Sequence, residues 1–129
     1  MSGRVVHFEI PFDDGTRARR FYAEAFGWDC AEWPGMDYTM VTTGPGESGA
    51  PSEPGFVNGG MVARSQTVDA PAITIDVEDI DAALERVEAL GGTTVEAKQP
   101  VADMGFAAYF RDSEGNLMGL WQSPPAPTP

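Results

Sequence analysis

The sequence predicts an α+β fold made of two tandem βαβββ modules, and three observations carry this prediction. Val5–Trp28 alternates apolar and polar residues and then changes to a period of 3.6, the pattern of a strand followed by a helix. The same pattern returns at Ala70–Thr93, where Asp79 takes the place of Asp14. Three further strand-like runs follow each copy. Neither module has enough strands to bury its own sheet and helix, so we expect the two to pack as one domain.

The first module is predicted over residues 1–64. Its opening strand is Arg4–Phe12, with Val6, Phe8 and Ile10 on the face that packs against the helix. Asp13 or Asp14 caps the helix and Gly27 ends it, and a broad apolar stripe is expected to face the core. The next strands are predicted at Trp28–Trp33, Tyr38–Thr43 and Phe56–Arg64, and Gly59-Gly60 in the last of them indicates a close backbone approach or a bulge. Residues 44–55 hold four Gly and three Pro, which indicates an exposed, mobile loop.

The second module is predicted over residues 70–123, after a polar connector. It begins with the strand Ala72–Val77, of which Ile73, Ile75 and Val77 are expected to pack inward. Asp79 caps a helix that ends at Gly91 and Gly92. Three strands follow, with a loop at 98–105 and a turn at 112–116; they are predicted at Thr93–Ala97, Phe106–Arg111 and Leu117–Gln122. Residues 124–129 form a Pro-rich tail that we expect to be loose.

The charge balance excludes several classes of partner. Eight cationic and twenty acidic residues give a net charge of −12, which disfavours nucleic acids and anionic membrane surfaces. No apolar run approaches the roughly 20 residues of a membrane span, and the first residues lack the apolar core of a signal peptide. Cys30 is the only cysteine, so no internal disulfide can form. These features predict a cytoplasmic protein.

Several stretches resemble the vicinal oxygen chelate superfamily, which includes glyoxalase I, bleomycin-resistance proteins and extradiol dioxygenases. The resemblance is carried by VVHFEIP, RARRFYAEAFGW, WPGMDYTMV, VEDIDAALERVEALGG and DSEGNLMGLWQ, which together with the repeat cover nearly the whole chain. The turn at Asp112–Asn116, followed by a strand that ends Gly-Leu-Trp-Gln, is the most specific part. The resemblance implies that the two modules form a cupped mixed sheet, with the chemistry of the family inside the cup.

The same resemblance allows the metal site of the superfamily to be checked position by position. Metal-dependent members use four ligands from the first and last strands of both modules, usually two His and two carboxylates. His7 matches the first ligand, but its counterpart in the second module is Ala72, or Pro71 if the register slips. The last strand of the first module, Val57–Ala63, has no acid, and the remaining position is Gly119. One imidazole holds a metal poorly against water, so we predict no cofactor. A divalent Zn, Ni, Mn or Fe ion on His7 remains the alternative.

Strand alternation alone, independently of the family resemblance, indicates which residues face the cup. It places a few polar groups beside apolar and aromatic walls, as is typical of a small-molecule pocket. His7 and Glu9 are the candidate acid and base groups. Glu9 and Asp76 should also face the cup, so a metal site with a different set of ligands remains an alternative. A face that is only solvated, or covered by a dimer partner, is the other interpretation. The candidate binding residues are Val5, Trp33, Tyr38, Met40, Thr74, Asp76, Tyr109, Gly119 and Trp121.

Three functions remain open at this point. The leading prediction is metal-free sequestration of a small, partly aromatic molecule, as in the bleomycin-resistance group; the acidic charge would suit a cationic ligand. The alternative is an enzyme, a lyase, isomerase or dioxygenase, which uses His7 as a metal ligand or as an acid or base. An enzyme would be a glyoxalase-type lyase or an extradiol-type dioxygenase. The third is an interaction module without a ligand. A homodimer is expected, with Trp28, Trp33 and Phe56 as contact residues.

Overall fold

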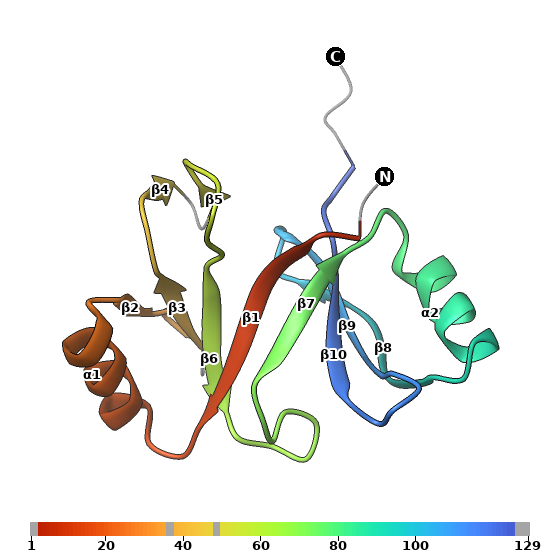
Figure 1. The fold of residues 1–129 in the computed structure, drawn as a ribbon, viewed down its shortest axis with the longest axis horizontal. Coiled ribbons are helices and arrows are strands. Elements are labelled where there is room, and N and C mark those ends of the chain that lie inside the picture. Colours follow the sequence, from red (N-terminus) through yellow and green to blue (C-terminus); the bar gives the residue numbers. More distant parts are fainter. Residues whose placement is uncertain (1–2, 36–37, 48–49, 126–129) are drawn as a thin grey trace. The chain divides into compact units, whose positions relative to one another are not determined.

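A computed structural model describes residues 3–35, 38–47 and 50–125, and the chain divides into two compact units (Figure 1). The N-terminal unit is Val6–Ile73. The C-terminal unit is Thr74–Pro129 together with Met1–Val5. Each unit contains one helix and four strands of a mixed sheet, so the predicted α+β class and the repeated βαβββ order are confirmed. The module limits at 64 and 70 remain a prediction.

The sheet of the N-terminal unit is built around β1 (Val5–Phe12). β6 (Gly59–Ala63) runs parallel to β1, with Glu9 opposite Gly60. On the far side of β6, β3 (Tyr38–Thr42) and then β2 (Asp29–Glu32) follow in antiparallel order. Parallel strands require a crossover, and here the chain from α1 through β3 supplies it.

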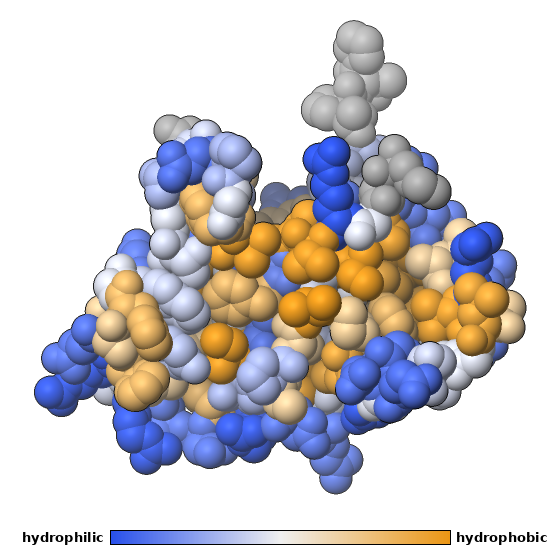
Figure 2. Space-filling model, in the orientation of Figure 1, coloured by the Kyte–Doolittle hydropathy of each residue, from blue (hydrophilic) through white to orange (hydrophobic). Residues whose placement is uncertain are grey.

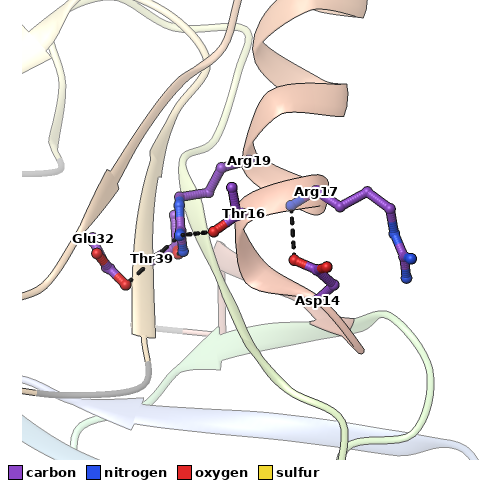
Figure 3. Close-up of polar contacts among 6 residues, drawn as sticks. All are labelled: Asp14, Thr16, Arg17, Arg19, Glu32 and Thr39. Atoms are coloured by element: carbon purple, nitrogen blue, oxygen red, sulfur yellow. Dashed lines mark hydrogen bonds and ion pairs between the residues drawn. The ribbon is translucent and has the colours of Figure 1, made fainter.

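The helix of this unit, α1 (Gly15–Phe26), begins at Asp14, whose carboxylate accepts a hydrogen bond from the Arg17 backbone N–H at 3.0 Å. A polar side chain links it to the sheet: Arg19 donates to the Thr39 hydroxyl at 3.2 Å and lies 3.6 Å from Glu32 (Figure 3). The predicted core-facing stripe is only partly correct: Ala18 and Tyr22 are half-buried, whereas Phe21, Ala25 and Phe26 are exposed, and no described residue of α1 is fully buried. Apolar periodicity marks a face, but it does not show what covers that face.

The C-terminal unit has the larger apolar core. Its strands follow the order β7 (Ala72–Asp76), β10 (Leu117–Gln122), β9 (Gly105–Arg111) and β8 (Thr93–Val101). The helix α2 (Ile80–Ala89) begins at Asp79, whose carboxylate accepts from the Ala82 N–H at 3.2 Å. The buried core residues are Ile80, Leu84, Ala108, Phe110 and Leu120. Here most of the predicted helix stripe faces the core: Ala83 and Val87 pack against the buried residues, and only Leu90, at the end of the stripe, is exposed, at 74%.

Three details differ from the predictions. β8 continues to Val101, although residues 98–105 were expected to be a loop; Pro100 is tolerated because β8 is the outermost strand of its unit. The predicted loop at 44–55 contains a short antiparallel pair, β4 (Gly46–Glu47) and β5 (Ala50–Pro51). Ile73, expected to pack inward, is 44% exposed.

None of the described helices is long and apolar enough to cross a membrane.

Candidate functional site

A hydrogen bond joins two residues of the N-terminal unit that are distant in the chain. The His7 Nε2 atom and the Tyr38 hydroxyl are 2.7 Å apart, although 31 positions separate them in the chain. Glu9 follows two residues after His7 on the same face of β1, and its side chain is 7% exposed. A buried acid on the same face as a hydrogen-bonded His–Tyr pair is an uncommon arrangement, so this cluster is a candidate functional site.

Gly60 makes room for the cluster. It lies in β6 between Glu9 of β1 and Met40 of β3, and a Cβ atom at this position would overlap the Tyr38 phenol. The Tyr38 ring therefore lies across the bare backbone of β6 toward β1. The pair Gly59-Gly60 was expected to mark a close backbone approach or a bulge, and the Tyr38 ring does approach the backbone at Gly60 closely.

Aromatic and apolar residues surround the polar cluster. The Trp33 ring meets the Tyr38 ring edge to face, with centroids 6.1 Å apart. Met40 is in register with Gly60 and Glu9, so its side chain shares their face of the sheet. The structure thus brings five of the predicted site residues onto one face, which we call the polar–aromatic face: His7, Glu9, Trp33, Tyr38 and Met40.

Burial changes the titration of this face. It lowers the pKa of His7 to about 4, so the imidazole is neutral at pH 7. Burial also raises the pKa of the Tyr38 phenol, and the nearby Glu9 carboxylate raises it further. Near neutral pH the His7–Tyr38 pair therefore carries no charge, and either partner can donate according to the tautomer of His7.

The other predicted residues share one face of the C-terminal unit. Gly119 in β10 is opposite Thr74 in β7 and Tyr109 in β9, and a Cβ at Gly119 would lie 2.8 Å from the Thr74 hydroxyl. One pair further along, Trp121 is opposite Asp76. Strand alternation places these residues on a common side, whereas Val5, at the start of β1, is 44% exposed.

The residues present do not fit the metal site of the superfamily. Ala72 and Gly119 have no donor atom, and β6 reads Gly-Gly-Met-Val-Ala. Among the residues that the structure describes, no group of three or more His, Cys, Asp or Glu side chains is placed to hold an ion. His7 instead has Tyr38 as its partner. No chemical step is therefore assigned to a metal here.

The opposite face of β1 borders an apolar groove of about 410 Å³ in the same unit. Sequence reasoning assigned Phe8 and Ile10 to packing beneath a helix, and it did not predict an open groove. Its wall residues come from five separate segments of the chain, so the sequence alone does not group them. Only the alternation of β1 indicated that Phe8 and Ile10 share a face. The lining residues are Phe8, Ile10, Trp28, Thr43, Val57, Pro71, Ala72 and Ile73.

Comparisons with known proteins agree with the fold and with part of the sequence. Residues 4–44 match the family model of the bleomycin resistance protein-like N-terminal domain. The chain is 31% identical over 122 residues to the "Putative glyoxylase CFP32" of Mycobacterium bovis, which covers 89% of this chain. The chain spans only 44% of the length of that relative.

Two solved structures have the same fold along almost all of the chain. A Streptomyces coelicolor methylmalonyl-CoA epimerase aligns over 100% of both chains, with a TM-score of 0.65 and 14% identity. A glyoxalase/bleomycin resistance protein/dioxygenase superfamily member from Vibrio splendidus covers 95% of this chain and 99% of its own, with a TM-score of 0.61 and 17% identity. They show that the chain has the fold of the glyoxalase/bleomycin resistance protein/dioxygenase superfamily, the vicinal oxygen chelate superfamily. The sequence matches, to a bleomycin resistance protein-like domain and to a putative glyoxylase, agree with this fold.

Proposed function

We propose that the protein binds a small cationic, partly aromatic molecule on its polar–aromatic face and sequesters it without a metal. The observation that carries the proposal is the His7–Tyr38 hydrogen bond beside the buried Glu9 carboxylate. A cation placed there would lie next to an acidic side chain, and the Trp33 and Tyr38 rings offer faces for stacking and cation–π contacts. In the C-terminal unit we propose the same role for Thr74, Asp76, Tyr109, Gly119 and Trp121.

Apolar walls with a few polar groups are the usual composition of a small-molecule site. The family match over residues 4–44 includes four residues of this face that lie in β1 and β3, namely His7, Glu9, Tyr38 and Met40. We also propose that the chain functions as a homodimer, since members of this superfamily commonly pair.

A thermal-shift screen of cationic aromatic compounds, with metal-free bleomycin among them, tests the proposal. Compounds that raise the melting temperature are then titrated by calorimetry against two variants. Tyr38→Phe removes one neutral hydrogen-bonding group and should weaken binding about fivefold. Glu9→Gln removes a buried charge and should weaken binding by a factor of about ten or more. The matched controls are Tyr22→Phe and Glu32→Gln, which remove the same groups outside this face. Binding that is unchanged in Tyr38→Phe and Glu9→Gln would refute the site.

The second candidate is an enzyme, and the lowered pKa of His7 favours it. A neutral imidazole can accept a proton at pH 7, and Glu9 is a second proton-handling group on the same face. The fold is shared with a methylmalonyl-CoA epimerase, so proton transfer next to a thioester carbonyl belongs in the assay set with glyoxalase and extradiol cleavage. Turnover that is lost in His7→Gln would move the protein into the enzyme class; turnover that persists in this variant would exclude His7 as the acid or base.

A further inference from the structure

The apolar groove beside β1 takes no part in the proposed function, because it lies on the face of β1 opposite to His7 and Glu9. Its volume of about 410 Å³ falls within the roughly 300–1,000 Å³ of small-molecule sites. All eight lining residues lie within Val6–Ile73, so the N-terminal unit forms the groove by itself. Figure 2 shows apolar side chains gathered over β1 and β6 of this unit.

Two adjacent glycines leave the backbone of β6 bare on both of its faces. Gly59 is opposite Phe8 of β1, and a Cβ atom at Gly59 would lie 2.5 Å from the Phe8 ring. Gly60, the next residue, makes room for the Tyr38 ring on the polar–aromatic face. Glycine inside a strand weakens the strand, and it often marks a place where another group approaches the backbone closely. One glycine thus serves the polar–aromatic face, and the other makes room for an aromatic wall of the groove.

The second aromatic wall of the groove is Trp28. Its ring lies 5.7 Å from the Phe8 ring between centroids, with the two planes tilted by 40°. The indole is also stacked on Tyr22 of α1, with centroids 4.9 Å apart and an angle of 8° between the planes. Contacts within the chain therefore orient Trp28 and Phe8 without a ligand. Aromatic walls favour a ligand with flat rings, which can stack on them or meet them edge to face.

The wall that Thr43 and Val57 form is also held in place by the chain. The Thr43 hydroxyl donates a hydrogen bond to the Val57 carbonyl at 2.8 Å. Next to this bond, the Phe56 ring packs on Gly44, where a Cβ atom would lie 2.6 Å from the ring. The two ends of the segment 43–57 are thus joined, and this part of the groove is formed in advance, as is usual for small-molecule sites.

The groove contains no charge, although the whole chain carries −12. Apart from the Thr43 hydroxyl and the Trp28 indole N–H, its lining side chains are hydrocarbon. A charged ligand would lose hydration there without gaining a counter-ion. Ile73 adds a large aliphatic side chain that is 44% exposed and that a ligand would cover. We propose that this groove is a second small-molecule site, which binds a neutral molecule built of flat aromatic rings independently of the polar–aromatic face.

A pair of fluorescent probes tests this inference on the full-length protein. N-phenyl-1-naphthylamine is neutral, and 8-anilino-1-naphthalenesulfonate has the same rings with an added sulfonate. The neutral probe should bind saturably, with one molecule per chain and a rise in fluorescence. The sulfonate should bind at least about tenfold more weakly, because the groove offers its charge no partner.

Substitutions in the groove locate the binding site of the neutral probe. Ile73→Lys places a charge in the groove and should weaken binding at least about tenfold. Val95→Lys is the matched control: Val95 is also a β-branched residue in a strand, 37% exposed, but it lies in β8 of the other unit, and this variant should bind as the wild type does. Val57→Phe fills part of the groove without adding charge and should also weaken binding about tenfold. Circular dichroism and thermal melting of each variant establish that it is folded.

Four outcomes would overturn the inference. Equal binding of the two probes would indicate loosely packed apolar surface rather than a site that selects neutral molecules. Binding that persists in Ile73→Lys and Val57→Phe would place the probe elsewhere, and its loss in Glu9→Gln would then identify the polar–aromatic face. Binding that falls as the protein concentration rises would show that a second copy of the chain covers the groove. Displacement of the probe by 1-decanol but not by 2-naphthol would indicate a site for alkyl chains.

The two sites are tested by different compounds and different variants, so the two proposals can fail separately. Cationic compounds and the Glu9 and Tyr38 variants test the polar–aromatic face. Neutral rings and the Ile73 and Val57 variants test the groove, which lies on the other side of β1.

Discussion

His7 is the only histidine of the chain, so its titration can be followed without ambiguity. Burial lowers its pKa to about 4, while in the unfolded chain it titrates near 6.5. The unfolded state therefore binds a proton first as the pH falls, and the folded state loses stability from about pH 6.5 down to pH 4. We expect the imidazole resonances in NMR to titrate near pH 4, and His7 to account for a loss of about 1–3 kcal/mol across this range.

His7→Gln provides the control, because it removes the titrating group and keeps a hydrogen-bonding side chain. Urea unfolding of both proteins at pH 7, 5.5 and 4.5 separates the contribution of His7 from that of the carboxylates. The wild type should lose more stability than the variant on acidification. A histidine that titrates near 6.5 in the folded protein would contradict the burial of this side chain.

Gly60 gives a second prediction at the level of single residues. In Gly60→Ala the new methyl group overlaps the Tyr38 ring, so the ring must move and its hydrogen bond to His7 should break. We expect a loss of about 1–3 kcal/mol in the free energy of unfolding, measured in urea. In the Tyr38→Ala background the same substitution should cost much less, since the overlapping atoms are gone. Equal costs in the two backgrounds would show that Tyr38 does not lie over Gly60.

At the level of elements, the two helix caps should contribute unequally to stability. Asp14 and Asp79 make the same capping hydrogen bond, at 3.0 and 3.2 Å. The helix α2 carries two core residues, so Asp79→Ala should lower the free energy of unfolding by about 1 kcal/mol. No described residue of α1 is fully buried, so Asp14→Ala should mainly loosen that helix, with a smaller global cost. Urea unfolding followed by circular dichroism measures both; equal costs would mean that α1 unfolds only with its unit.

At the level of the whole molecule, metal dependence separates the two candidate functions. We expect the purified protein to contain no stoichiometric metal in mass spectrometry, and its melting temperature to be unchanged by EDTA or by added Ni²⁺, Zn²⁺, Mn²⁺ or Fe²⁺. The reason is that three of the four ligand positions of the superfamily hold no metal-binding side chain, for example Ala72 and Gly119. Stoichiometric metal that disappears in His7→Ala would reverse this expectation and favour an enzyme.

The sequence predicts the polar–aromatic face well because strand alternation is a local property. Once β1 and β3 are recognised, alternation places His7 with Glu9 on one face of β1 and Tyr38 with Met40 on one face of β3; the register through β6 brings these faces to the same side of the sheet. The hydrogen bond between His7 and Tyr38 could not be predicted, since it depends on the register of β3 with β6 and of β6 with β1. The role of Gly60 depends on the same register.

Burial of the helices was only partly predictable. The apolar periods of α1 and α2 are alike in sequence, yet Ile80 is fully buried and Phe26 is 64% exposed. Periodicity describes one helix, whereas burial depends on the other elements that meet it. The extra length of β8 was missed for a related reason: Pro100 reads as a strand breaker unless the strand is known to lie at an edge.

The uneven burial of α1 and α2 also bears on how the molecule opens. Amide protons exchange with solvent through local unfolding, and exchange is slowest where the opening must disrupt buried apolar contacts. The helix α2 and strands β9 and β10 share the core of Ile80, Leu84, Ala108, Phe110 and Leu120, so their amides should keep their protons longest. The amides of α1 should exchange earliest among the helices, and a partner that covers α1 would slow them. Two copies of the same sequence pattern would thus form one unit that opens rarely and one unit whose helix opens readily.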